Sequence, residues 1–137
     1  MVVPSVVCED LRVDLRQAVT EFHQVYGLPV RDVPDTRVPE KQLRIDLIAE
    51  EFEELQEALA ADDVVETADA LADLLYVVMG AALTFGVPID EVVDEVHRSN
   101  LSKLGEDGQP IRREDGKILK GPDFFTPDIA GVLERHR

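Results

Sequence analysis

This chain of 137 residues contains one cysteine, no tryptophan and few aromatic residues of any kind. A single cysteine, Cys8, cannot form an internal disulfide bond. The first ten residues, MVVPSVVCED, contain no basic leader, and no stretch approaches the roughly 20 apolar residues of a membrane span. We therefore expect a cytoplasmic protein without a membrane partner.

Basic residues are scarce as well. Lys and Arg number 14 against 29 Asp and Glu, which gives a formal net charge of −15 at pH 7. A surface of this sign repels nucleic-acid backbones and anionic lipids, so we expect neither to be the main partner. The chain is rich in carboxylates instead, and their placement carries the functional signal.

Alternating apolar and polar residues, the pattern typical of a half-buried strand, do not run long enough to predict a convincing strand, and helical spacing predominates. Proline and glycine mark the expected helix ends, and Asp63 with Glu66 forms a capping-box pattern. The expected helices cover about residues 8–26, 39–61, 63–85, 88–103 and 127–134. We expect one all-α domain, 1–137, with a helical core at about 8–103 and a tail at about 104–137.

The helix expected at 63–85 is apolar on almost every side. Its apolar residues are Val64, Ala68, Leu71, Ala72, Leu74, Leu75, Val78, Met79 and Ala82. A helix with this pattern is normally buried. A single layer of four helices would leave it poorly covered, so we expect the bundle to be completed in a homodimer or homotetramer.

Three acidic residues interrupt this apolar helix within one narrow sector: Glu66, Asp69 and Asp73. The preceding helix directs Glu50 and Glu54 along an apolar side, with Glu51 three residues from Glu54. Carboxylates gathered in a partly dry interior raise one another's pKa, and a divalent cation removes that penalty. Oxygen ligands without His or Cys nearby suit Mg²⁺, with Mn²⁺ as a substitute, far better than zinc.

The order of these motifs resembles a known family. EEFEE, which contains Glu50, Glu51 and Glu54, is followed by ADLLYV, which contains Asp73. This is similar to the Glu-Glu-x-x-Glu and Glu-x-x-Asp signature of the all-α nucleoside triphosphate pyrophosphohydrolases, which include MazG, the dimeric dUTPases, the dCTPases and phosphoribosyl-ATP pyrophosphohydrolase. EVHRSNLSK and REDGKILKGP look like the closing segments of MazG-like proteins, so the resemblance covers roughly residues 11–133. It departs at Ala70, where the family has a glutamate, and Asp69 or, more weakly, Glu66 is the expected substitute.

The resemblance implies a MazG-like four-helix core and metal-dependent hydrolysis of an NTP or dNTP to the monophosphate and pyrophosphate, for example in nucleotide-pool sanitation. The implied metal ligands are Glu50, Glu51, Glu54, Asp69 and Asp73. One glutamate must orient or deprotonate the attacking water, and we favour Glu51 over Glu50. A basic tail is expected to close over the triphosphate. The expected substrate-binding residues are the basic residues Lys103, Arg113, Lys117 and Lys120, together with the amide side chain of Asn100 on the preceding helix.

Two alternatives stay open. The alanine at position 70 favours a catalytically weak helical module with an interaction or regulatory role. A related pyrophosphohydrolase that acts on phosphoribosyl-ATP or another diphosphate would carry the same motifs. The preferred base and sugar do not follow from the sequence.

Overall fold

A computed structural model describes residues 14–137, whose contacts form two compact units. The first unit contains the described residues up to Arg31 together with Thr36–Phe85, and the second contains Asp32–Asp35 and Gly86–Arg137. The sequence predicted a division between core and tail near residue 104. The contacts group residues 86–103, the last part of the predicted core, with the tail.

The first helix, α1 (Leu15–Val25), begins after Asp14, whose side chain accepts a hydrogen bond of 3.0 Å from the Gln17 N–H. Asp14 has an extended backbone, as a helix N-cap requires. A helix that runs without interruption from about residue 8 is therefore excluded at Asp14, and the predicted start itself lies outside the described part of the chain. Gly27 follows the helix with φ +69°, which confirms the predicted left-handed glycine cap.

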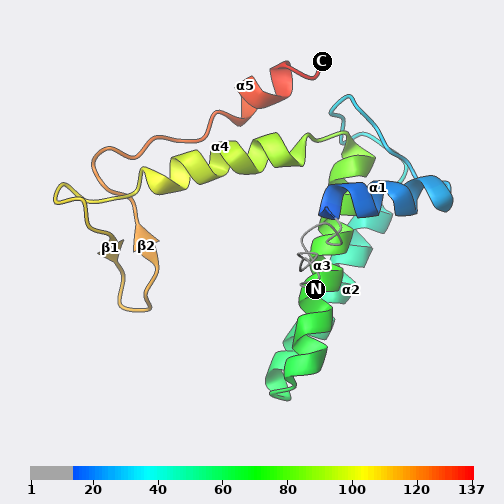
Figure 1. Ribbon diagram of the computed structural model, residues 1–137, viewed down its shortest axis with the longest axis horizontal. Helices are drawn as coiled ribbons and strands as arrows, with labels where there is room; N and C mark the ends of the chain where they lie inside the picture. The colour runs from blue at the N-terminus through cyan, green and yellow to red at the C-terminus, as the bar shows by residue number, and fades with distance from the viewer. Residues whose placement is uncertain (1–13) are drawn as a thin grey trace, which may run out of the picture. The chain divides into compact units, whose positions relative to one another are not determined.

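Two long helices, α2 (Lys41–Ala60) and α3 (Val64–Phe85), form an antiparallel hairpin, and α1 packs on α3 (Figure 1). Pro39 was predicted to open α2, but Glu40 is the N-cap, so the helix begins two residues later. Gly86, with φ +67°, ends α3 as predicted.

Asp63 caps α3, as predicted. Its Oδ1 accepts hydrogen bonds of 3.1 Å from the backbone N–H groups of both Val65 and Glu66. Glu66 thus contributes its backbone to the cap, and its carboxylate lies in a pocket described below. The capping box expected from the sequence is only half present.

The two halves of α3 differ in burial. The C-terminal half is packed, with Met79 to Thr84 all buried, whereas Val64 is 78% exposed and Leu75 is 59% exposed. The prediction of an all-round buried helix is therefore wrong for the N-terminal half, because α1 packs on α3 nearer its other end (Figure 1). α3 is also long and apolar enough, by length and composition alone, to cross a membrane, contrary to the expectation from the sequence. Core helices of soluble proteins meet the same criterion, so this likeness is weak evidence for a span.

The second unit contains α4 (Ile89–Leu101), a hairpin of β1 (Ile111–Arg112) and β2 (Ile118–Leu119), and α5 (Ile129–Glu134). The strands pair antiparallel, with Ile111 opposite Leu119. Two-residue strands are too short to show alternation, so the sequence did not predict them. The chain is mostly helical, rather than entirely helical as predicted.

The tail of the second unit is fastened to α4 by side chains of that helix. Ser99, which is buried, donates a hydrogen bond of 2.7 Å from its Oγ to the carbonyl oxygen of Phe125. Glu95 accepts a bond of 2.9 Å from the Asp128 N–H and forms an ion pair of 2.8 Å with Arg98. The hydrogen bond from Arg98 has the largest effect on the pKa of Glu95, followed by the bond from the Asp128 N–H, and the pKa is lowered to about 2. The helix predicted at about 127–134 is confirmed as α5, which packs on α4.

Candidate metal and catalytic site

Three carboxylates from the two long helices meet in the α2–α3 hairpin. Glu51 and Glu54 lie three residues apart on one side of α2, and Asp73 approaches them from α3. One carboxylate oxygen of each residue lies within 4.8 Å of the other two. We call Glu51, Glu54 and Asp73 the acidic triad.

Crowding and burial perturb the titration of the triad. Burial raises the pKa of Glu51, and the negative charges of Glu54, Asp73 and Glu50 raise it further. Burial also raises the pKa of Asp73, with added effects from Asp69 and Glu54. Glu51 Oε2 is buried and has no hydrogen-bond partner. The triad is therefore electrostatically unfavourable as it stands and would be relieved by a cation.

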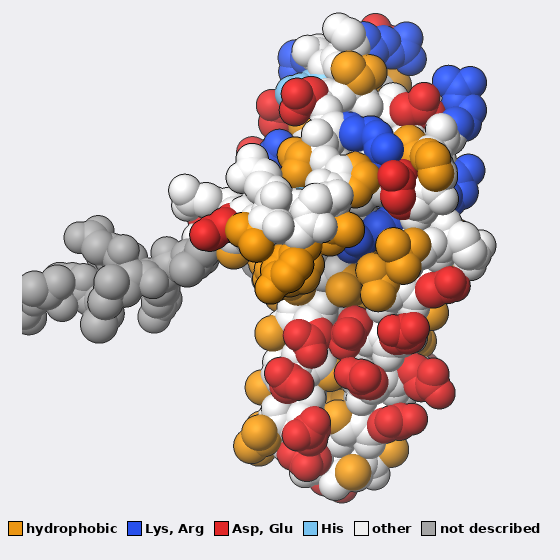
Figure 2. Space-filling view, turned by 90° about the vertical axis from the view of Figure 1, so that its right-hand side faces the viewer, with side chains coloured by type: hydrophobic (Ala, Val, Ile, Leu, Met, Phe, Trp, Pro, Cys, Tyr) orange, Lys and Arg blue, Asp and Glu red, His pale blue; other side chains and the backbone are white. Residues whose placement is uncertain are grey.

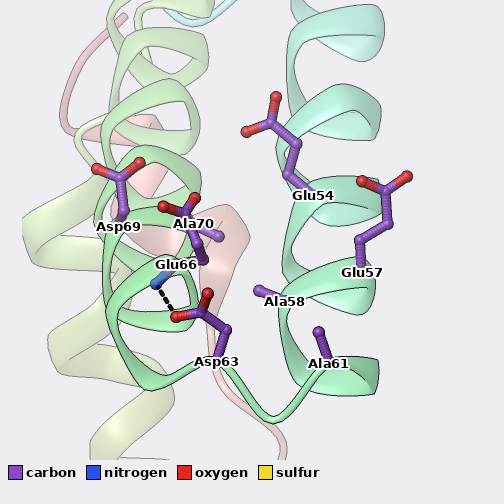
Figure 3. Close-up of a pocket in the computed structure, with 8 residues that line it drawn as sticks. All are labelled: Glu54, Glu57, Ala58, Ala61, Asp63, Glu66, Asp69 and Ala70. Atoms are coloured by element: carbon purple, nitrogen blue, oxygen red, sulfur yellow. Dashed lines mark hydrogen bonds between the residues drawn. The ribbon is translucent and has the colours of Figure 1, made fainter.

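A pocket of about 420 Å³ adjoins the triad toward the closed end of the hairpin and shares Glu54 with it. Figure 3 shows Glu54 and Glu57 on α2, with Glu66 and Asp69 across from them on α3. The acidic residues that line this pocket are Glu54, Glu57, Asp63, Glu66 and Asp69, and the small residues that line it are Ala58, Ala61 and Ala70. Glu57, which is exposed, belongs to this lining.

Ala70 occupies the position where the resembled family has a glutamate. It is only 3% exposed, and Ala58, on the facing helix, is also buried. Both residues line the same pocket. The two helices pack through small side chains at this point, so the alanine is part of the packing as well as a missing carboxylate.

Two predicted ligands, Glu50 and Asp69, lie outside the triad and are exposed. Each is still close enough for its charge to raise the pKa of a triad member, Glu50 that of Glu51 and Asp69 that of Asp73. The expected dry interior is also only partial, since Glu54 is exposed and the other two members are half-buried. The roles of Glu50 and Asp69 remain predictions.

The predicted substrate-binding residues all belong to the second unit. Asn100 is exposed on α4, and Lys103 is half-buried just beyond that helix. In the hairpin, Arg113 pairs with Asp115 at 2.5 Å, and Lys117 is exposed. Lys120 is held over the ring of Phe124, 4.7 Å from its centre. Their predicted contact with a substrate remains a prediction.

Carboxylates also dominate the outer surface of the hairpin. Figure 2 shows acidic side chains gathered along its lower part, where the two long helices run together. An anionic substrate would meet a repulsive surface here unless cations were bound. The surface therefore favours a site that works with metal ions.

Comparison with known proteins places this hairpin in a family. Residues 19–100, well over half of the chain, match the phosphoribosyl-ATP pyrophosphohydrolase family. The chain therefore belongs to this family, within the MazG-like NTP pyrophosphohydrolases, and the resemblance seen in the sequence is confirmed. The match includes the whole acidic triad and ends at Asn100, so the basic tail lies beyond it.

Two individual proteins are similar to the chain. An uncharacterised protein of Acanthamoeba polyphaga mimivirus is 34% identical over 121 residues, which cover 85% of this chain and 45% of that protein. The chain thus spans less than half the length of this relative. A crystal structure of a candidate NTP pyrophosphohydrolase from Exiguobacterium sp. 255-15 matches with a TM-score of 0.47 and 24% identity, covering 91% of this chain and 94% of that one.

Arg44 is a charged residue of this hairpin that was not predicted to be buried or functional. Arg44 of α2 is only 5% exposed, and its Nη2 donates a hydrogen bond of 3.0 Å to the carbonyl oxygen of Val77 on α3. Burial lowers the pKa of its guanidinium. A usable signal was present, because Arg44 precedes Glu51 by seven residues and so lies on the same side of the helix.

Proposed function

We propose that the chain is a Mg²⁺-dependent nucleoside triphosphate pyrophosphohydrolase. It would hydrolyse the bond between the α- and β-phosphoryl groups and release the monophosphate and pyrophosphate. The acidic triad carries this proposal, because three carboxylate oxygens from two helices lie within 4.8 Å of one another. Membership of the pyrophosphohydrolase family supports the choice of a phosphoanhydride as the bond that is cleaved.

The donor set of the triad fits a hard divalent cation. All three donors are carboxylate oxygens, the ligands that Mg²⁺ and Mn²⁺ prefer. The partnerless Oε2 of Glu51 and the mutual repulsion within the triad are both relieved when a cation binds. Glu51, Glu54 and Asp73 would hold the ion, which when bound would neutralise phosphate charge and acidify a water molecule.

Glu51 is the group best suited to take the proton from the attacking water. One of its two carboxylate oxygens faces the other members of the triad, which leaves the second oxygen to accept the proton. The water oxygen would bond to the α-phosphorus as its proton passes to Glu51. The α–β bridging bond then breaks, and pyrophosphate leaves with the bonding electrons. Glu50, next along the helix, is the alternative base.

The basic side chains of the tail would bind the phosphates. Lys103, Arg113, Lys117 and Lys120 supply positive charge that the hairpin lacks, and Asn100 offers both a donor and an acceptor to a base or sugar. Arg113 would exchange Asp115 for a phosphate. Phosphoribosyl-ATP is a second candidate substrate, favoured by the family that the chain matches.

Self-association would complete the bundle. Exposed and half-buried apolar residues follow a 4-3-4-3 spacing on α3, with Val64, Ala68, Leu71, Leu75 and Val78. A matching 3-4-3-4 spacing runs along α2, with Ile45, Ile48, Phe52, Leu55 and Leu59. Such heptad stripes pack against other helices, and a second copy of the same hairpin would make a four-helix bundle.

Pyrophosphate release tests the activity directly. We expect one or more ribo- or deoxyribonucleoside triphosphates, or phosphoribosyl-ATP, to release pyrophosphate in the presence of Mg²⁺ and not in EDTA. Asp73→Asn should abolish this release without loss of helicity, because it removes a triad charge and keeps the side-chain shape. Glu53→Gln is the matched control on an exposed site outside the triad and should be fully active. An Asp73→Asn protein with full activity would refute the proposed site.

A further inference from the structure

A buried arginine and a glycine face each other across the two long helices. A Cβ atom on Gly80 would lie 2.2 Å from Arg44 Nη2 and 3.1 Å from Arg44 Cζ. The guanidinium therefore occupies the space that any larger side chain at position 80 would need. The ring of His23, from α1, borders the same space at 3.1 Å. We call the contact of Arg44 with Gly80 the arginine–glycine lock.

Polar bonds fix both partners of the lock. Arg44 Nη2 donates to the carbonyl oxygen of Val77, one helical turn before Gly80. Thr84, which is fully buried, donates a bond of 2.8 Å from Oγ1 to the carbonyl oxygen of Gly80. The His23 ring is anchored in turn by Nδ1, which lies 2.8 Å from the carbonyl oxygen of Pro29. The guanidinium thus cannot shift along α3 without losing a bond or meeting a side chain.

Burying the guanidinium of Arg44 at this position is energetically unfavourable. Arg44 is 5% exposed, and its Nε has no hydrogen-bond partner. A buried charge with an unsatisfied donor costs stability that an apolar side chain of similar size would not. The best-attested use of such a group is to fix the register of packed helices, since only one alignment satisfies it.

The lock and the acidic triad share one alignment of the two helices. Glu51 follows Arg44 by seven residues on α2, and Asp73 precedes Gly80 by seven residues on α3. Because the helices are antiparallel, the two pairs lie on the same seam, about 10 Å apart along the axis. A slip of α2 along α3 that broke the lock would also separate Glu51 from Asp73.

We infer that Arg44, packed on Gly80, is a positioning residue that fixes the register of α2 against α3 and so holds Glu51 opposite Asp73. This inference deepens the proposed metal site and rests on it. Arg44 does not touch the triad in this role. It acts through the alignment of the two helices.

Two variants test the lock from its two sides. Arg44→Met removes the charge and keeps much of the volume, whereas Gly80→Ala keeps the arginine and displaces it. Without a clash, Gly→Ala inside a helix raises the melting temperature. Because the added Cβ would clash with Arg44, we expect Gly80→Ala to lower the melting temperature instead. Mn²⁺, which replaces Mg²⁺ and gives an EPR spectrum, should bind each variant about tenfold or more weakly than the native chain, with a changed spectrum.

A change of stability alone must be separated from a change of register. Val19→Ala removes fully buried apolar volume on α1, outside both α2 and α3, and is the stability-matched control. It should lower the melting temperature and leave Mn²⁺ affinity unchanged. Nitroxide labels at the exposed positions Gln56 and Ala72, in a Cys8→Ser background, report the alignment of α2 and α3 without metal.

Both readouts decide the inference. A changed distance between the labels in Arg44→Met and Gly80→Ala, but not in Val19→Ala, is the expected result. An unchanged distance with native Mn²⁺ affinity in both variants would overturn the lock, as would an equal loss of affinity in Val19→Ala. If the native chain itself binds no Mn²⁺, the proposed function fails, and the distance between the labels still decides whether Arg44 sets the register.

Discussion

Asp69 lies one helical turn before Asp73 on α3, and its negative charge raises the pKa of Asp73. The two carboxylates therefore interact electrostatically, although Asp69 is exposed and lies outside the acidic triad. Asp69 also lines the pocket that shares Glu54 with the triad. It borders the acidic triad from the side on which the family glutamate is missing.

Asp69→Asn should therefore weaken the metal site. We expect a higher Mg²⁺ requirement for activity, because the variant removes one negative charge beside Asp73. Glu66→Gln should have little effect, since Glu66 caps α3 through its backbone N–H and not its side chain. Mg²⁺ titrations of pyrophosphate release compare the two. A fully active Asp69→Asn together with an inactive Glu66→Gln would reverse this assignment.

Restoring the family residue with Ala70→Glu should not rescue Asp69→Asn. Ala70 is 3% exposed and lines the acidic pocket together with Ala58, so a glutamate there would be partly desolvated and repelled by the other carboxylates of the pocket. We expect a loss of about 2 kcal/mol or more in the free energy of unfolding. Urea denaturation measures this loss, with the exposed, neighbouring Ala72→Glu as control. Recovered activity in the double variant would show that the helices can open enough to admit the glutamate.

The sequence predicted the helices well because glycine, proline and capping residues mark most of their ends. Gly27 and Gly86 both have the left-handed backbone expected at those sites, and Asp63 caps α3 as predicted. Local rules were sufficient for these features. The three members of the triad were among the five metal ligands that the family resemblance implied, and the i, i+3 spacing placed Glu51 close to Glu54.

The remaining features depend on tertiary contacts. Ala70 was treated as a missing ligand, because a sequence does not show that Ala70 is buried between α2 and α3 together with Ala58. Arg44 was not singled out from the sequence: its seven-residue spacing from Glu51 places it on the same side of α2, but its contact with Gly80 depends on how the two helices pack. The burial of α3 was overestimated for a related reason, since apolar periodicity does not say whether the covering helix belongs to the same chain.

The raised pKa values of Glu51 and Asp73 predict how stability depends on pH in the absence of metal. In the folded chain these carboxyls keep their protons to higher pH than in the unfolded chain. The free energy of unfolding should therefore fall as pH rises above the ordinary carboxyl range and through their folded-state pKa values. Glu95, with a pKa of about 2, stays ionised over this range and adds no slope.

Urea denaturation at several pH values, with and without Mg²⁺, measures this dependence. Asp73→Asn should flatten the slope in EDTA, and saturating Mg²⁺ should flatten it in the native chain, because each removes the repulsion in the triad. Stability that rises with pH in the metal-free native chain would contradict the predicted sign.

The exposed stripe on α3 gives a prediction for assembly. Leu75 is 59% exposed in the single chain and lies in the middle of the heptad spacing. If a second copy covers this stripe, Leu75→Glu buries a charge in an apolar interface and should convert a dimer or tetramer at micromolar concentration into monomers. Light scattering after size-exclusion chromatography measures the mass.

Val65→Glu is the control. It introduces the same charge on the same helix at a site that is 71% exposed and lies off the stripe, so it should leave the assembly intact. A native chain that is monomeric, or an oligomer that Leu75→Glu leaves unchanged, would show that the stripe is not the interface.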